Sequence, residues 1–169
     1  MRKSLFYFGL SIFIFTSCHT AKTTKPSAAD PDHGATLGNY KDWLPPDFDP
    51  KNATLMIEMS LPFTSEEEKM IEYLKEKYPW RCTFVITGDV YKKTGTFGDV
   101  NKYRYALMNK SYLLERADPT KGFAPVQDFY FYDRLNDKVY PNTRKGSYKK
   151  LVTFRPLINT IVQVNSSKG

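Results

Sequence analysis

The chain has 169 residues, a formal net charge of +7 and an aromatic content of 15%. This length suits one ordinary domain with a single hydrophobic core, plus a tail. Both histidines, His19 and His33, precede the residues expected to fold. The commonest general base and metal ligand is therefore excluded from the predicted domain.

Residues 1–17 are predicted to be an export signal. Arg2 and Lys3 form a basic start, residues 5–15 are almost entirely apolar, and the small polar residues Thr16 and Ser17 end the run. This order of basic, apolar and small residues is typical of a secretory signal. A membrane-spanning helix needs about 20 apolar residues, so the run is too short to span a bilayer.

Thr16-Ser17-Cys18 stands where an ordinary signal peptide has an Ala-x-Ala cleavage pattern. The motif resembles the lipobox of bacterial lipoproteins, in an aromatic-rich form similar to that of Bacteroidota, although Phe15 replaces the usual leucine. The resemblance implies that Cys18 is diacylated on its sulfur and becomes the mature N-terminus. Several acyl chains would then hold the protein on a membrane. An ordinary cleaved signal peptide and an uncleaved short anchor are the alternatives.

His19 bears on which membrane holds the protein. Many lipoproteins retained at the inner membrane have an aspartate after the lipidated cysteine, and this chain has histidine there. The resemblance therefore implies an outer-membrane lipoprotein that faces the periplasm. Cys82 would then be the only remaining thiol, which excludes an intramolecular disulfide, and its strand-like surroundings indicate a small buried apolar residue.

Residues 18–51 are predicted to be a flexible tether, because prolines punctuate them and their periodic apolar content is low. Four residues in this stretch are apolar enough to pack back on the domain, which leaves its boundary open: Tyr40, Trp43, Leu44 and Phe48. Residues 52–169 are expected to form one domain.

Two helices are predicted in this domain. Thr64 and Glu67 have the spacing of a capping box, and the helix that follows is expected to end before Pro79. The second helix is predicted from apolar residues at i, i+3, i+4, i+7 and i+8, with Thr153 as a candidate cap and Pro156 in the first turn. Those apolar residues are Phe154, Leu157, Ile158, Ile161 and Val162.

Strands are expected where apolar and polar residues alternate, or where β-branched and aromatic residues gather. These stretches are residues 53–59, 81–90, 102–109, 128–134 and 138–140. The order β-α-β-β-β-β-α predicts an α+β fold with a mostly antiparallel sheet of about five strands and two helices on one face. The first β-α-β could instead be a parallel unit.

No catalytic motif emerges from the residue types. Ser147-Tyr148-Lys149-Lys150 and Lys93-Thr94-Gly95 match two motifs of penicillin-binding proteins, but their order is reversed and the chain is too short for that fold. No cluster of Cys, His or Asp has metal-ligand spacing, so no metal or cofactor is predicted. Asp128 and Asp133, which flank an aromatic strand, are the first candidates for a carboxylate-dependent hydrolase.

Tyrosine interleaved with lysine and arginine is the most distinctive feature. Tyrosine and arginine are favoured at binding surfaces, and alternation places Tyr130 and Tyr132 on the face opposite Phe129 and Phe131. The candidate binding surface comprises Tyr103, Arg104, Tyr105, Tyr130, Tyr132 and Arg134. Cross-strand aromatic pairs that merely stabilise the sheet are the competing interpretation.

The sequence therefore favours a cell-envelope lipoprotein with a non-catalytic domain that binds an envelope protein or an anionic glycan. An excess of basic residues over 133–155 suits anionic partners, although a solvated loop gives the same pattern. Nucleic acid is not expected as a partner of an exported protein. The alternatives are a small envelope hydrolase and a passive structural component of an envelope complex.

Overall fold

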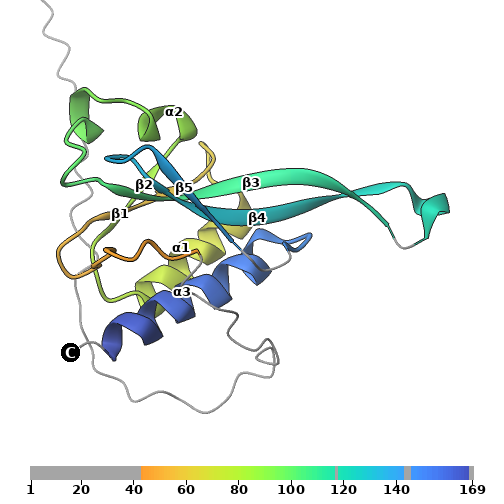
Figure 1. The fold of residues 1–169 in the computed structure, drawn as a ribbon. Coiled ribbons are helices and arrows are strands. Elements are labelled where there is room, and N and C mark those ends of the chain that lie inside the picture. Colours follow the sequence, from red (N-terminus) through yellow and green to blue (C-terminus); the bar gives the residue numbers. More distant parts are fainter. Residues whose placement is uncertain (1–42, 117, 143–145, 168–169) are drawn as a thin grey trace, which may run out of the picture.

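Residues 43–116, 118–142 and 146–167 are described by the computed structural model of the protein. The export signal and Cys18 lie outside these ranges. The described residues form an α+β domain in which one five-stranded sheet has the order β2-β1-β3-β4-β5 (Figure 1). The strands are β1 Leu55–Glu58, β2 Cys82–Val85, β3 Tyr105–Glu115, β4 Phe123–Asp133 and β5 Lys138–Pro141. The helices are α1 Ser65–Lys77, α2 Thr87–Val90 and α3 Lys150–Ser166, and the short 3₁₀ turns are η2 Gly95–Phe97 and η3 Pro119–Lys121.

The sheet confirms the predicted fold class and number of strands, and the predicted, mostly antiparallel pairing is roughly consistent with the mixed sheet that the structure shows. β1 runs parallel to both β2 and β3, whereas β3, β4 and β5 pair antiparallel. Parallel neighbours need a long crossover between them. α1 supplies the crossover from β1 to β2, and residues 86–104, which contain α2 and η2, supply the one from β2 to β3.

α1 begins where the sequence predicts. The backbone N–H of Glu67 donates to the side-chain oxygen of Thr64, and the Glu67 carboxylate accepts from the backbone N–H of Thr64 at 2.9 Å. This reciprocal capping box satisfies two backbone donors that have no partner within the helix. Lys75 and Lys77 lie in the last turn, where cations interact favourably with the helix dipole.

α3 begins at Lys150, earlier than the predicted cap at Thr153. The backbone N–H of Leu151 donates to Oε1 of Glu66 at 3.1 Å, so a carboxylate of α1 caps the first turn of α3. Thr153 instead donates its hydroxyl to the backbone oxygen of Gln127 on β4. Pro156 consequently lies inside the helix rather than in its first turn.

α1 and α3 cover one face of the sheet, as predicted (Figure 1). The core beneath them includes three buried residues of the predicted tether, Trp43, Leu44 and Phe48. The Trp43 and Phe131 ring centroids are 5.7 Å apart, and those of Phe48 and Phe131 are 5.3 Å apart. The folded domain therefore starts at least as early as Trp43, and residues 43–51 do not belong to the tether.

A second, smaller core lies on the opposite face of the sheet. Met56, Ala106 and Met108 of the sheet pack there against Val90 and Tyr132, and the 86–104 connection covers them. The predicted strand 81–90 ends at Val85, because the chain turns into α2 at Thr87 and crosses this face.

β3 and β4 extend beyond the rest of the sheet as a two-stranded ribbon. They pair from Tyr105 opposite Asp133 to Glu115 opposite Phe123, whereas β1 pairs with β3 only at Ala106 and Leu107. Figure 1 shows this ribbon projecting past the helices, with η3 at its tip. We call residues 109–115 and 123–128, together with η3, the arm. The sequence prediction ended the first of these strands at Asn109 and began the second at Asp128, so it missed most of the arm.

Candidate binding surface

Arg134 is buried and holds the 86–104 connection in place. Its guanidinium donates to four backbone oxygens, at 2.5 to 2.8 Å. These oxygens belong to Val90, Lys92, Phe97 and Tyr103. Burial lowers the pKa of Arg134, yet a guanidinium keeps its proton at neutral pH. Arg134 therefore stabilises the domain from inside and does not belong to an exposed surface.

Arg104 forms an ion pair with the buried carboxylate of Asp133. Its Nε and one terminal nitrogen donate to the two carboxylate oxygens of Asp133, at 3.0 and 2.7 Å, and it also pairs with Asp47. Asp133 has no exposed surface and accepts further from the backbone N–H groups of Leu135 and Asn136. Burial opposes its charge, but Arg104 and Asn136 outweigh burial and hold the pKa of Asp133 below its usual value. The pair fixes the turn between β4 and β5.

The four tyrosines of the predicted surface separate onto two faces. Tyr105 is buried in the core beneath the helices, where its ring meets Phe48 edge-on at 5.1 Å. Tyr130 and Tyr132 lie on the opposite face, as alternation predicts, and Tyr103 packs against the same second core. The structure therefore does not bring the six predicted residues together on one exposed surface.

A smaller group of tyrosines does come together, around the end of β1. We call Tyr91, Tyr130 and Tyr132 the tyrosine cluster. Tyr91 is 54% exposed, and its ring centroid is 5.4 Å from that of Tyr132. Glu58 lies beside the cluster, where it accepts from the Thr87 hydroxyl and from the backbone N–H of Asn109.

The hydroxyls of Tyr130 and Tyr132 stay protonated at neutral pH. Burial raises the pKa of Tyr130 to about 12, and the neighbouring Tyr91 hydroxyl and Glu58 carboxylate add to the effect. Burial also raises the pKa of Tyr132 to about 12, together with the hydrogen bond that its hydroxyl donates to Asp137 at 2.6 Å. Such phenols donate hydrogen bonds to a partner but do not act as bases at neutral pH.

Glu58 and Tyr91 are not among the residues predicted from the sequence. Alternation from Met56 places Glu58 on the face opposite the helices, so its side could be predicted from the strand alone. Tyr91 could not be placed in this way, since it follows α2 and reaches Tyr132 only because the connection folds over the sheet.

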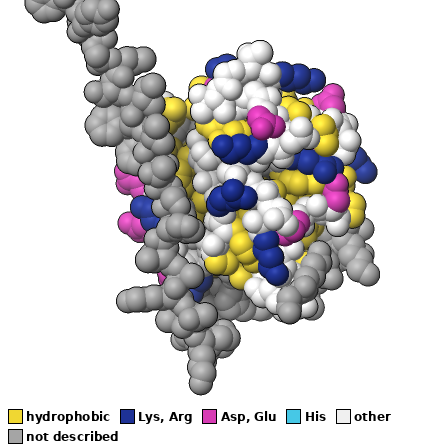
Figure 2. Space-filling view, turned by 90° about the vertical axis from the view of Figure 1, so that its left-hand side faces the viewer, with side chains coloured by type: hydrophobic (Ala, Val, Ile, Leu, Met, Phe, Trp, Pro, Cys, Tyr) yellow, Lys and Arg dark blue, Asp and Glu magenta, His cyan; other side chains and the backbone are white. Residues whose placement is uncertain are grey.

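The interleaved lysines and arginines of the sequence form contacts with the aromatic rings. Cations lie over the rings of Tyr103, Tyr105 and Tyr140 at 4.6 to 5.1 Å from their centroids. Lys92 pairs with Asp89 at 2.6 Å. Figure 2 shows the side of the molecule that carries residues of the 86–104 connection, and there basic, acidic and hydrophobic side chains alternate. The visible face is therefore mixed in charge rather than uniformly basic.

Asp128 and Asp133 do not form a catalytic carboxylate pair. They lie five residues apart on β4, so their side chains point to opposite faces of the sheet. At about 3.4 Å per residue their backbones are roughly 17 Å apart, beyond the roughly 5 to 9.5 Å that separates glycosidase carboxylates. Asp128 instead accepts from the side-chain amide of Asn142 at 3.0 Å.

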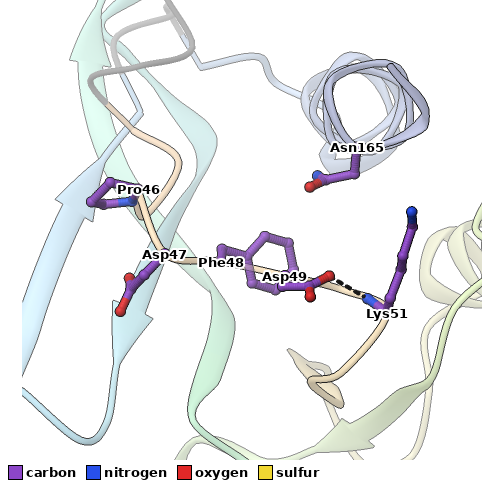
Figure 3. A pocket seen from close by; sticks show the side chains of 6 residues that line it. All are labelled: Pro46, Asp47, Phe48, Asp49, Lys51 and Asn165. Carbon is purple, nitrogen blue, oxygen red and sulfur yellow. Dashed lines mark hydrogen bonds between the residues drawn. The ribbon is translucent and has the colours of Figure 1, made fainter. Parts of the chain in front are cut away.

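A shallow cavity of about 290 Å³ lies elsewhere, between residues 46–51 and the end of α3. In Figure 3, Asn165 faces it from α3, and Lys51 extends along its side, while Asp49 accepts from the backbone N–H of Lys51 at 2.9 Å. The amide nitrogen of Asn165 donates to the backbone oxygen of Ile161. Asp47, Asp49 and Lys51 contribute charged side chains to its lining, and Asp47 also pairs with Arg104.

Within residues 43–116, 118–142 and 146–167, no group of three acidic, His or Cys residues is placed to hold a metal ion. No helix of that part of the chain is long and apolar enough to cross a bilayer. No family model matches the chain, and no curated protein or solved structure is significantly similar to it.

Proposed function

We propose that the protein is a cell-envelope lipoprotein whose domain binds a partner through the tyrosine cluster. Lipid on Cys18 would hold it on the outer membrane, facing the periplasm, and residues 19–42 would link the lipid to the domain. The partner class is an envelope protein, with an anionic glycan as the alternative.

The observation that carries this proposal is the exposed ring of Tyr91 over a buried aromatic base. Tyr91 packs on Tyr132, which is itself buried, and lies next to the hydroxyl of Tyr130. A tyrosine held in this way offers a large contact area and a hydrogen-bonding hydroxyl at small entropic cost. This arrangement is favourable for binding and provides no nucleophile or general base.

The charges near the cluster favour a protein over an anionic glycan. Lys92 is paired with Asp89, Lys102 lies over Tyr103, and Glu58 places a carboxylate beside the cluster. A polyanion would meet few unpaired cations there and one carboxylate, whereas a protein surface with mixed polarity would not be repelled.

The test is capture of the partner by cross-linking in intact envelopes, followed by mass spectrometry. Tyr91→Ala is expected to reduce the captured partner at least about tenfold, as for a central aromatic contact. Tyr148→Ala is the matched control, because Tyr148 is also exposed, at 60%, but precedes α3. Equal capture by the wild type and both variants would show that the tyrosine cluster is not the binding site.

A panel of anionic envelope glycans tests the alternative with the same variants. If the wild type binds a glycan and Tyr91→Ala does not, the partner of the tyrosine cluster is a glycan and not a protein. Turnover of any glycan would instead contradict the proposal of a binding domain.

A further inference from the structure

The arm offers a strand edge that no described residue pairs with. Beyond Leu107, β1 no longer pairs with β3, and Glu58 accepts the backbone N–H of Asn109 at 2.7 Å. The chain then turns away from this edge at Ser60, whose N–H and hydroxyl both donate to Glu67. Among the described residues, the edge of β3 past Asn109 has no neighbouring strand.

The direction of the peptide groups on this edge follows from the pairing of β4. Both the N–H and the C=O of Gln127 bond to Ser147, on the outer side of β4. Gln127 lies opposite Ser111, so this is a pair whose backbone groups point away from each other. By the same alternation, the N–H and C=O of Ser111 and Leu113 point outward from the free edge of β3.

The side chains along the arm are unusually apolar for a projecting ribbon. Leu113 is 69% exposed and Phe123 is 63% exposed, and both lie on the face that α1 and α3 cover further along the sheet. Leu114 is also exposed, on the other face. Lys110 and Glu115 place charges at the two ends of this edge, and no proline lies between them. A long strand edge with exposed apolar residues promotes pairing with another chain where no proline blocks it.

The other exposed edges of this part of the sheet are blocked in that way. β4 carries Pro125, which has no N–H to donate, and its Gln127 is already bonded to Ser147. The backbone at residues 146 and 147 lies very close to β4. Gly146 permits this, since a Cβ there would lie 2.6 Å from the backbone oxygen of Gln127. β5 is short, with Lys138 at one end and Pro141 at the other. Proline and a short strand discourage strand addition.

We infer that the free edge of β3 between residues 110 and 115 is a docking site for an extended segment of another protein. The segment adds as a strand in the line of β1, and its backbone pairs with the N–H and C=O groups of Ser111 and Leu113. Because Leu113 and Leu114 face opposite sides, the incoming strand carries apolar residues on both faces. This mode of recognition takes its affinity from main-chain hydrogen bonds and its specificity from side chains at alternate positions. The site uses none of the three residues of the tyrosine cluster.

The test is selection of random twelve-residue displayed peptides on the full-length protein, purified from membranes in detergent. Leu113→Pro removes a backbone N–H that points outward and takes no part in the β3–β4 pairing. Pro125 lies opposite Leu113 on β4, so the ribbon already accepts a proline at such a position. Phe123→Pro is the matched control, because Phe123 occupies the equivalent outward position on β4. The expected result is binding that is unchanged in Phe123→Pro and at least tenfold weaker in Leu113→Pro.

Hydrogen exchange on the complex identifies the edge directly. The amides of Ser111 and Leu113 should exchange at least about tenfold more slowly when a selected peptide is bound. If Leu113→Pro does not fold, Leu113→Lys serves instead, since it leaves the backbone unchanged and adds a charge. Three results would overturn the inference: no enriched peptide, protection on β2 or β5 instead, or an arm that binds only a second copy of the chain or lipid vesicles in the absence of peptide.

Discussion

Replacing Arg134 by alanine should destabilise the domain strongly, because this residue is buried inside it. The substitution leaves the backbone oxygens of Val90, Lys92, Phe97 and Tyr103 without their donor. A net contribution of about 1 kcal/mol for each of four hydrogen bonds gives a loss of about 4 kcal/mol in the free energy of unfolding. With a urea m-value of about 2 kcal/mol per M, the midpoint of unfolding should fall by about 2 M.

Arg134→Lys distinguishes charge from geometry. A lysine ammonium keeps the positive charge but cannot reach four diverging oxygens as a planar fork does. We expect it to recover at most half of the lost stability. Arg155→Ala is the control, because Arg155 is exposed and only lies over the ring of Tyr73; it should change stability by less than about 1 kcal/mol.

The assay is urea unfolding followed by circular dichroism, with hydrogen exchange of residues 90–103 as a local readout. In Arg134→Ala the amides of this connection should exchange faster than those of β3 and β4. Because Tyr91 lies in the connection, the variant should also lose partner capture without losing any direct contact. An Arg134→Ala variant within about 1 kcal/mol of the wild type, or an Arg134→Lys variant equal to it, would show that the four hydrogen bonds do not stabilise the domain as proposed.

Three further predictions concern buried groups. Burial opposes the charge of Glu67, but Lys150 and hydrogen bonds from Ser60 and Thr64 hold its pKa at about 2, against an ordinary value of 4.5. Stability from this lowered pKa is present above about pH 4.5 and is lost as the pH falls towards 2. Glu67→Gln should therefore cost about 3 kcal/mol at pH 7 and much less near pH 2, as measured by urea unfolding at both values. Trp43→Ala should lower the free energy of unfolding by about 3 to 5 kcal/mol in thermal unfolding, because Trp43 is buried against Phe131. A loss below about 1 kcal/mol would show that residues 43–51 belong to the tether and not to the folded domain. Asp133→Asn should cost about 3 kcal/mol and Asp128→Asn less than about 1 kcal/mol in the same assay, since of these two residues only Asp133 is fully buried and ion-paired; the opposite ranking would contradict the assigned roles.

Local signals predicted the elements whose causes are local. The capping box of α1 and the apolar stripe of α3 depend on residues within a few positions of one another, and both appear where expected. The alternation of Phe129, Tyr130 and Phe131 likewise predicted the two faces of β4.

Long-range contacts explain what the sequence did not predict. Glu66 extends the start of α3 from another helix, so no pattern near Lys150 reveals it. Arg134 resembles a surface arginine in the sequence, but the 86–104 connection folds over it and supplies four acceptors. The parallel pairing of β1 with β3 arises because that same connection crosses the sheet. The candidate surface was therefore predicted only in part: Tyr130 and Tyr132 belong to the tyrosine cluster, whereas Tyr105 and Arg134 are buried.

The proposed function depends on lipid attachment at Cys18, which intact mass spectrometry of the protein from envelope membranes can detect. A lipoprotein should yield a chain that begins at Cys18 and carries the added mass of at least two acyl chains. A chain with an unmodified Cys18 thiol, or one cleaved after it, would show that the protein is not a lipoprotein.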